Sequence, residues 1–404
     1  MKNEEKNMSV YLDYQAAKPV DVRVVSEMTM YLNKKFANPS SLHCEGDEAT
    51  NALSISRQKV ADFINAPNPD SIIFTSGATE SNNLALIGSV MRNKKKGNHI
   101  IISEIEHISI LNIAKYLERQ GFKVSRVPVD QYGTVRLDKL ARLITDKTIL
   151  ISISTASNEV GSLQPIEEIS EIAVKNNILF HTDAVASESV IPLDVQQIPI
   201  DLMTLSSNDI YGPRGVGALY LKKGVRVNPI IIGGGQERGI RSGSENIPGI
   251  VGFAKAAEIM KNEIHADAEK LKILRDKLIK GILESIPKSH LNGHPEHRLP
   301  YNAHFRFDYI EGESLILSLK DENIAAATGS ACSSRTLEPS HTLIAMGLLH
   351  EEAHGSLEVT LGRFTQDKDV DKLIEVLPNI VKRLRLLSPL TPPDLVKKYN
   401  EVNE

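Results

Sequence analysis

The sequence contains only two cysteines, Cys44 and Cys332, among its 404 residues. They lie far apart and form no CxxC pair, so neither a zinc knot nor a disulfide framework is expected. No apolar run approaches the roughly 20 residues that cross a bilayer, and the chain does not begin with the basic and apolar regions of a secretory signal. We therefore expect a cytoplasmic protein with free thiols and no membrane partner.

A strong excess of charge of either sign is also lacking. The chain has 47 basic and 51 acidic residues, a formal net charge of −4, and 41% hydrophobic residues. These values are typical of a soluble globular protein and give no reason to expect nucleic acid as a partner. A chain of this length can form two cores, so we expect one large and one smaller domain.

Short β-branched runs alternate with longer helical stretches from about residue 70, and strands are predicted at 72–74, 148–154, 178–185 and 201–207. This rhythm indicates an α/β fold with a mostly parallel sheet that binds ligands at the carboxyl ends of its strands. A charged helical stretch at about 251–284 then leads into a separate α+β domain. The polar tail after residue 388 is expected to be a loosely held arm.

Polar residues follow several of the predicted strands. Gly77 permits a tight turn, and Thr79 begins a helix whose free N–H groups could receive an anion. Asp183 ends an apolar strand, where a buried acid needs a cation such as a protonated pyridine nitrogen. His107 and Asn158 follow two further strands. Thr79 and His107 could each be a simple helix cap, and Asn158 a turn residue, but together these residues place a phosphate cradle, an acid, an aromatic ring and an amide along one rim.

Ten segments carry a more specific signal. They are YLDYQAAKPV, FANPSSLH, FTSGATESNNLA, the pair Glu106-His107, SNEVG, HTDAVAS, DLMTLSSNDIYGPRGVGALY, GGGQERGIRSGSEN, SACSS and LGRFT. In this order, and over nearly the whole chain, they resemble the landmarks of cysteine desulfurases of the NifS/IscS kind. The resemblance implies a homodimer of fold type I in the class V aminotransferase group, with pyridoxal phosphate as its cofactor. It also implies a large domain (18–262) with a mainly parallel seven-stranded sheet, a small α+β domain (1–17 and 263–390), and a tail (391–404).

The same resemblance implies roles for residues around the cofactor. Ala78, Thr79 and Ser206 would contact the phosphate, and Ser244 would reach it from the other subunit. His107 would stack on the pyridine ring. Asp183 would pair with the ring nitrogen and keep it protonated, which makes the ring an electron sink.

The resemblance also implies how substrate is handled. Asn158 and Arg363 would hold L-cysteine, the arginine through its carboxylate, although Arg363 could instead be a surface ion-pair partner. The Cys332 thiolate would take the sulfur as a persulfide, release L-alanine, and pass the sulfur to an iron–sulfur scaffold protein of the IscU kind. The alternative for Cys332 is a buried, inert thiol. Cys44 lacks such a context and is interpreted as structural.

The chain departs from the family pattern at one decisive position. Where the family has a histidine followed by the Schiff-base lysine, this sequence has Asn208 and Asp209. Arg214 cannot substitute, because a guanidinium stays protonated. Ala186 stands where a glutamine is usual. We therefore expect non-covalent pyridoxal phosphate or its pyridoxamine form, with Asp209 as a weak base and slow or absent turnover.

Two other functions remain open from the sequence. The chain could be a scaffold or sulfur-relay partner in iron–sulfur cluster assembly, with Cys332 accepting sulfur or ligating a cluster iron. The segment His350-Glu351-Glu352-Ala353-His354 also fits the zinc pattern H-E-x-x-H. Gly355 follows it at once and no third ligand is evident, so we interpret that pattern as a chance match.

Overall fold

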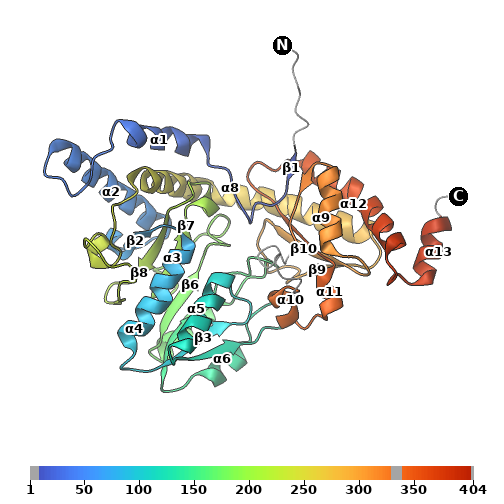
Figure 1. Cartoon of the computed structure of the whole chain (residues 1–404), viewed down its shortest axis with the longest axis horizontal. Coiled ribbons are helices and arrows are strands. Elements are labelled where there is room, and N and C mark those ends of the chain that lie inside the picture. Colours follow the sequence, from blue (N-terminus) through green and yellow to red (C-terminus); the bar gives the residue numbers. More distant parts are fainter. Residues whose placement is uncertain (1–8, 329–338, 402–404) are drawn as a thin grey trace, which may run out of the picture.

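The computed structural model describes residues 9–328 and 339–401 (Figure 1). Its large lobe contains a seven-stranded sheet with the order β2-β8-β7-β6-β5-β3-β4. The strands are β2 (Ile72–Thr75), β3 (His99–Ser103), β4 (Lys123–Val127), β5 (Thr148–Ser152), β6 (Leu179–Asp183), β7 (Leu202–Ser206) and β8 (Gly217–Leu221). β8 is antiparallel to both of its neighbours, and the other pairings are parallel. The predicted α/β fold with a mostly parallel sheet is therefore confirmed.

The strands are continuous apolar runs because helices cover both faces of the sheet. Alternate residues point to opposite faces, so Ile72 and Phe74 join one apolar cluster while Ile73 joins another. The first face packs against α2 (Cys44–Phe63), α6 (Leu137–Leu143), α7 (Ile166–Lys175) and the first part of α8 (Ile247–Ser285). The second face packs against η2 (Leu84–Gly88), α4 (Ser89–Asn93) and α5 (Ile108–Arg119), with α3 (Ala78–Asn83) leading into η2. The remaining helices of this lobe are α1 (Val22–Asn33), η1 (Pro69–Ser71), η3 (Asn208–Ile210) and η4 (Glu237–Gly239).

The small lobe is built on an antiparallel sheet with the order β12-β10-β9. Its strands are β9 (Ser289–Asn292), β10 (Asn302–Phe307) and β12 (Ser356–Thr360), and β1 (Val10–Tyr11) pairs with β11 (Ile324–Ala325) beside them. Its helices are α9 (Gly312–Asp321), α10 (His341–Ala345), α11 (His350–His354), α12 (Asp367–Leu387) and α13 (Pro393–Glu401). Figure 1 shows α8 running from one lobe into the other. The boundary predicted at 262/263 falls inside this continuous helix, and the domain division stays a prediction.

Two details differ from the sequence expectations. The helix predicted at about 251–284 extends over Ile247–Ser285, with Asn246 capping its first turn. The tail that we expected to be a loosely held arm forms α13 instead, and its Tyr399 hydroxyl accepts a hydrogen bond from the buried Arg385 at 2.8 Å. Within residues 9–328 and 339–401, no helix combines the length and apolar composition that crossing a bilayer requires.

Candidate active site

The carboxyl ends of five strands lie along one edge of the large sheet, because β2, β3, β5, β6 and β7 run in the same direction. In α/β sheets this edge is where ligands bind. Each predicted residue after a strand therefore reaches the same side of the sheet. These residues are Ala78 and Thr79 after β2, His107 after β3, Asn158 after β5, Asp183 at the end of β6, and Ser206 and Asp209 at the end of β7.

Asp183 is the buried acid of this edge, with 6% of its surface exposed. Its Oδ2 accepts a hydrogen bond from Asn82 Nδ2 at 2.7 Å, and its Oδ1 accepts one from the Val185 N–H at 3.1 Å. Burial raises the pKa of Asp183, while the hydrogen bond from Asn82 and the charge of His107 act in the opposite direction. The carboxyl group therefore sits in surroundings that favour a cationic partner.

A hydrogen-bonded path connects Asp183 to His107. Asn82 Nδ2 also donates to Ser109 Oγ at 3.1 Å, and His107 Nδ1 lies 2.8 Å from the same hydroxyl. His107 is the N-cap of α5, since Nδ1 accepts the Ser109 N–H at 3.2 Å. The cap role weighed from the sequence is thus present, and it fixes the imidazole ring near Asp183.

The turn between β2 and α3 has the backbone that the motif predicts. Gly77 adopts φ +147°, and an added Cβ would meet no atom within 4 Å, which leaves open space at this turn. Ala78 and Thr79 then begin α3, and their N–H groups belong to its unsatisfied first turn. These features suit close approach of an anionic group to the backbone.

A carboxylate and a guanidinium border that turn. Glu80 Oε2 accepts the Ser76 N–H at 2.7 Å, and Glu80 Oε1 is paired with Arg241 Nε at 2.9 Å. Ser244 is exposed and lines a small hollow together with Ser76 and Arg241. Within the described chain, Ser244 is therefore accessible beside the turn between β2 and α3.

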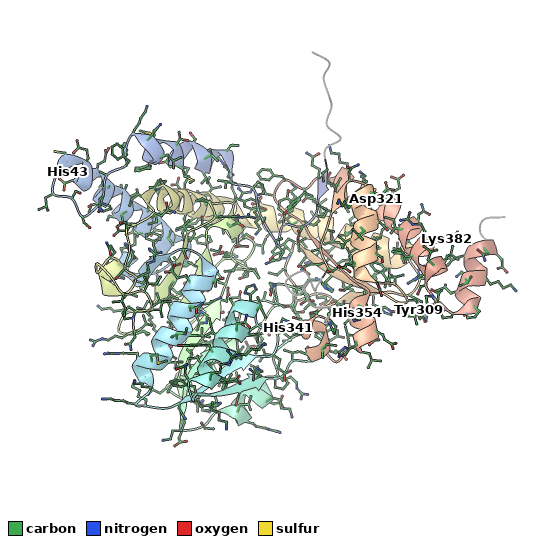
Figure 2. The ribbon with its side chains drawn as sticks, viewed as in Figure 1. His43, Tyr309, Asp321, His341, His354 and Lys382 are labelled. Atoms are coloured by element: carbon green, nitrogen blue, oxygen red, sulfur yellow. The ribbon has the colours of Figure 1, made fainter. Side chains whose placement is uncertain are left out.

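Glu106 directly precedes His107 in the chain and is 2% exposed. Ser154 donates to it twice, from Oγ at 2.5 Å and from the backbone N–H at 3.1 Å. Burial raises the pKa of Glu106 to about 8. His341 Nε2 lies 3.1 Å from the Glu106 carbonyl oxygen, and Figure 2 shows this histidine where the lobes meet. Through His341, the small lobe therefore contacts the loop that carries Glu106 and His107.

Asp209 lies in η3, the short turn after β7, and is half-buried. Burial raises the pKa of its carboxyl group, whereas the charge of Lys18 and a hydrogen bond from Ser206 lower it. Tyr211 ends the turn in the left-handed conformation, with φ 65° and ψ 24°. The charges of Asp183 and His107 both act on Asp209, so these three side chains share one electrostatic environment.

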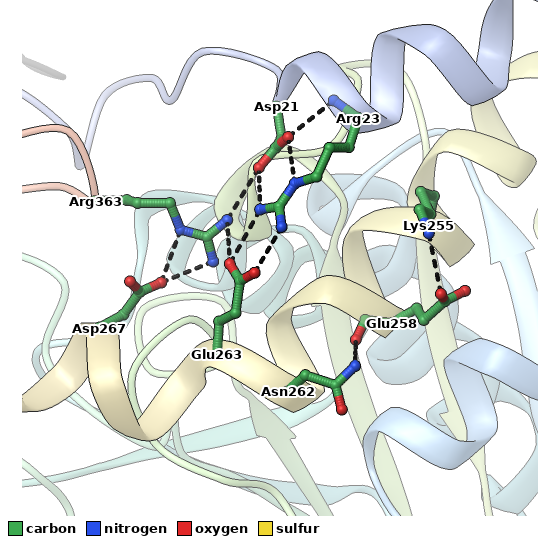
Figure 3. A network of polar contacts seen from close by, with 8 residues as sticks. All are labelled: Asp21, Arg23, Lys255, Glu258, Asn262, Glu263, Asp267 and Arg363. Carbon is green, nitrogen blue, oxygen red and sulfur yellow. Dashed lines mark hydrogen bonds and ion pairs between the residues drawn. The ribbon is translucent and has the colours of Figure 1, made fainter.

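Arg363 is bound by acidic side chains in this structure, as Figure 3 shows. Its Nη1 lies 3.1 Å from Asp21 Oδ2 and 3.2 Å from Glu263 Oε2, and its Nη2 lies 2.7 Å from Asp267 Oδ2. The guanidinium also stacks over the Tyr211 ring at 4.8 Å. This geometry matches the ion-pair alternative, so binding of a substrate carboxylate by Arg363 would require displacing at least one acid.

The other predicted residues are placed less decisively. Asn158 is half-buried in the loop after β5, and Cys44 is exposed at the first residue of α2. Ala186 is buried, and its carbonyl oxygen accepts a hydrogen bond from the Tyr301 hydroxyl at 2.6 Å. Cys332 lies outside the described residues.

The zinc pattern is present as helix α11 but does not assemble a site. His350 and His354 are exposed, and Glu352 accepts the Leu349 N–H as an N-terminal cap. In the part of the chain that the structure describes, no three His, Cys, Asp or Glu side chains are arranged to hold a metal ion.

Sequence reasoning missed three buried polar residues at this edge: Lys18, Asn82 and Glu188. Asn82 could have been found, because it lies one helical turn after Thr79 and therefore on the side of α3 near the strand ends. Lys18 and Glu188 each stand as an isolated charge in an apolar segment, QAAKPV and AVASESVI. Such a charge indicates a partner, but the sequence does not show which one.

The sheet order, the single antiparallel strand and the polar strand ends define a fold type I, pyridoxal-phosphate type of architecture. The family model described as aminotransferase class V matches residues 10–373, so the chain belongs to the class V aminotransferase family. It is 56% identical to a protein named cysteine desulfurase IscS 1 from Archaeoglobus fulgidus, over 94% of this chain and 99% of the relative. It is 50% identical to cysteine desulfurase IscS from Methanosarcina thermophila, over 96% of each chain.

Solved structures agree with the family. A NifS-like protein aligns with a TM-score of 0.88 and 37% identity, over 93% of this chain and 100% of that one. A structure described as SspA in complex with cysteine aligns with a TM-score of 0.78 and 33% identity, over 88% of this chain and 99% of that one. The predicted family and fold are therefore confirmed.

Proposed function

We propose that this protein is a cysteine desulfurase that seats pyridoxal phosphate without a covalent bond and turns over slowly on its own. The observation that carries the proposal is the buried Asp183 carboxyl group, which is linked through Asn82 and Ser109 to His107 at the sheet edge where the family binds its coenzyme. The 56% identity to a cysteine desulfurase over nearly the whole chain supports the choice of reaction.

The residues at this edge fit the coenzyme by their chemistry. Asp183, whose pKa is raised by burial, would regain its charged form beside a ring N–H⁺. The open turn at Gly77, the Thr79 hydroxyl and Ser206 suit a phosphate group, with Ala78 and the second subunit's copy of residue 244 completing the cradle. His107 is held where it can lie against a ring. When bound, the coenzyme would withdraw electrons from the α-carbon of the substrate.

Asp209 stands at the position that the family resemblance assigns to the coenzyme lysine. A carboxylate cannot form that covalent link, and it can serve only as a proton acceptor in the lysine's second role. In this proposal Asn158 contacts both coenzyme and substrate, and Arg363 exchanges an acidic partner for the carboxylate of L-cysteine. The Cys332 thiolate takes the substrate sulfur as a persulfide, and L-alanine is released.

The setting of this reaction is part of the proposal. The protein acts as a cytoplasmic homodimer and delivers sulfur to an iron–sulfur scaffold protein of the IscU kind. The exposed location of Ser244 is compatible with contact to a second subunit. No nucleic acid or membrane is required.

D209K tests the proposal, with D209N as the matched control that removes the charge without adding an amine. We expect D209K to attach pyridoxal phosphate covalently, shown by a borohydride-fixed mass increase, and to release alanine from cysteine about 10²–10⁴-fold faster than the natural chain. D209N should do neither. If D209K gains neither attachment nor alanine release, the desulfurase proposal fails. A sulfur-relay role, with Cys332 as acceptor or cluster ligand, then becomes the better explanation.

A further inference from the structure

Lys18 lies in the segment between β1 and α1 and is 7% exposed. Its Nζ donates to the carbonyl oxygen of Asp209 at 2.6 Å and to Ser189 Oγ at 2.9 Å. Asn208 Nδ2 donates in return to the Lys18 carbonyl oxygen at 3.0 Å. Hydrogen bonds in both directions therefore join the segment that carries Lys18 to the turn that carries Asp209.

Three acidic side chains interact electrostatically with this amine: Asp209 and Glu188, and more weakly Asp267. Glu188 is completely buried; its Oε1 accepts the Ser206 N–H at 3.0 Å, and its Oε2 has no hydrogen-bond partner among the described residues. Burial raises the pKa of both carboxyl groups, and the charge of Lys18 lowers it in each case. The charge of Lys18 thus acts on two acids, the completely buried Glu188 and the half-buried Asp209.

Two aromatic rings lie close to the Lys18 amine. The rings of Tyr211 and Tyr301 lie 5.5 Å and 5.3 Å from Nζ, within the range of a cation–π interaction. Burial lowers the pKa of Lys18, and the nearby acidic side chains offset only part of that effect. Removing a partner from such a buried cluster leaves an uncompensated charge.

We propose that Lys18 is a positioning residue of the candidate active site. Its amine holds the turn at the end of β7 through hydrogen bonds to the Asp209 carbonyl oxygen and Ser189, and its positive charge stabilises the ionised form of the Asp209 side chain. The role in catalysis rests on the proposed function, whereas the charge cluster itself does not depend on it. The other charged groups that act on the cluster are Arg363 and Asp267 near Lys18, and Asp183 and His107 near Asp209.

The first test measures the titration of Lys18 by NMR in chains with ¹³C-labelled lysine, with K18R used to assign its signal. D209N keeps the backbone carbonyl and removes one carboxylate, so the pKa of Lys18 should fall by roughly one unit or more. D146N, which changes a carboxyl group that is 83% exposed, is the control and should have no effect. An unchanged titration in D209N overturns the proposal. This measurement needs no coenzyme and no activity.

The second test uses the introduced amine of D209K, which would lie beside the Lys18 ammonium. A neighbouring cation lowers the pKa of an amine, so borohydride-fixed attachment of pyridoxal phosphate should have a lower pH midpoint in D209K than in D209K/K18M. D209K/K18R should behave like D209K, because the charge is retained. Equal midpoints in all three chains overturn the positioning role. If none of the chains is labelled, the coenzyme site of the proposed function fails, and the NMR titration still decides whether Lys18 and Asp209 are coupled.

Discussion

Two charge clusters contact the ring of Tyr211 and behave differently. In the Lys18 cluster (Lys18, Asp209 and Glu188), one buried amine interacts electrostatically with two acids, and the pKa values of both acids are raised. In the Arg363 network (Asp21, Arg23, Glu263, Asp267 and Arg363; Figure 3), two arginines meet three acids, and hydrogen bonding by Arg23 lowers the pKa of Asp21 to about 2. The same kinds of side chain therefore have opposite titration behaviour.

Exposure and hydrogen bonding explain the difference. Arg23 is 46% exposed on its side chain, so solvent carries part of the charge of the network, and its guanidinium can form paired hydrogen bonds with a carboxylate. Lys18 offers a single buried amine, and Glu188 Oε2 has no hydrogen-bond partner within residues 9–328 and 339–401. Polar groups without a full set of hydrogen bonds are common in sites that bind a ligand, because the ligand supplies the missing partner. An ion-pair network that only stabilises the fold gains nothing from them.

The largest predicted effect comes from removing the buried cation. K18M should lower the free energy of unfolding by about 3–5 kcal/mol at neutral pH, since the completely buried Glu188 and the half-buried Asp209 lose the positive charge that acts on both. R23M, in the exposed part of the Arg363 network, should cost only about 0–1 kcal/mol. Urea unfolding of both variants measures the contrast, and equal losses would show that the Lys18 cluster is no more tightly coupled than a surface network.

The sequence predicted the sheet well, because its strands are uninterrupted runs of residues such as Ile, Val and Leu, which read as strands by themselves. It also predicted which polar residues reach the ligand-binding edge, since parallel strands must end on one side. Asp183 and His107 were found for this reason. The path through Asn82 was not, because it depends on the orientation of a side chain within α3.

The Lys18 cluster could not be predicted, because its contacts join distant parts of the chain. Lys18 is 171 residues from Ser189 and 191 residues from Asp209. The partners of Arg363 were missed for the same reason, as Asp21 lies 342 residues away. Local patterns indicate that a charge is buried, but only the tertiary fold selects its partner.

A second prediction extends the comparison to Glu106, a buried acid that accepts hydrogen bonds from Ser154. The pKa of Glu106 is raised to about 8, so the folded chain holds this proton more tightly than the unfolded chain does. The resulting stabilisation is complete below the unfolded pKa of about 4.5 and is lost as the pH rises toward 8. Relative to E106Q, the natural chain should lose about 2–3 kcal/mol between pH 5 and pH 7, from a slope of at most about 1.4 kcal/mol per pH unit.

Urea unfolding of both chains at the two pH values checks this expectation. E106Q keeps an oxygen acceptor for the Ser154 N–H and stays neutral throughout. S154A leaves the acid in place and removes a hydrogen bond that lowers its pKa, so the loss of stability with pH should persist in S154A and move to higher pH. A difference between E106Q and the natural chain that does not change with pH would mean that Glu106 titrates as an exposed acid does.

The smallest predicted effect is in the Arg363 network. Here the stabilisation is lost when the pH falls, whereas that of Glu106 is lost when the pH rises. Asp21 has a pKa of about 2 in the folded chain, below its ordinary value of 3.8, so its stabilisation is present above 3.8 and is lost as the pH falls toward 2. D21N retains an acceptor for the Arg23 N–H at the start of α1, removes the charge, and replaces the oxygen that accepts from the Arg23 and Arg363 side chains with an amide nitrogen. At pH 7 it should lower the free energy of unfolding by about 1 kcal/mol, because its partner Arg23 is half-exposed and Arg363 keeps Asp267 and Glu263 as partners. The loss should shrink in high salt and vanish near pH 2. A loss of the same size at both pH values would show that Asp21 acts through packing, and the contrast with the Lys18 cluster would then be one of shape rather than charge.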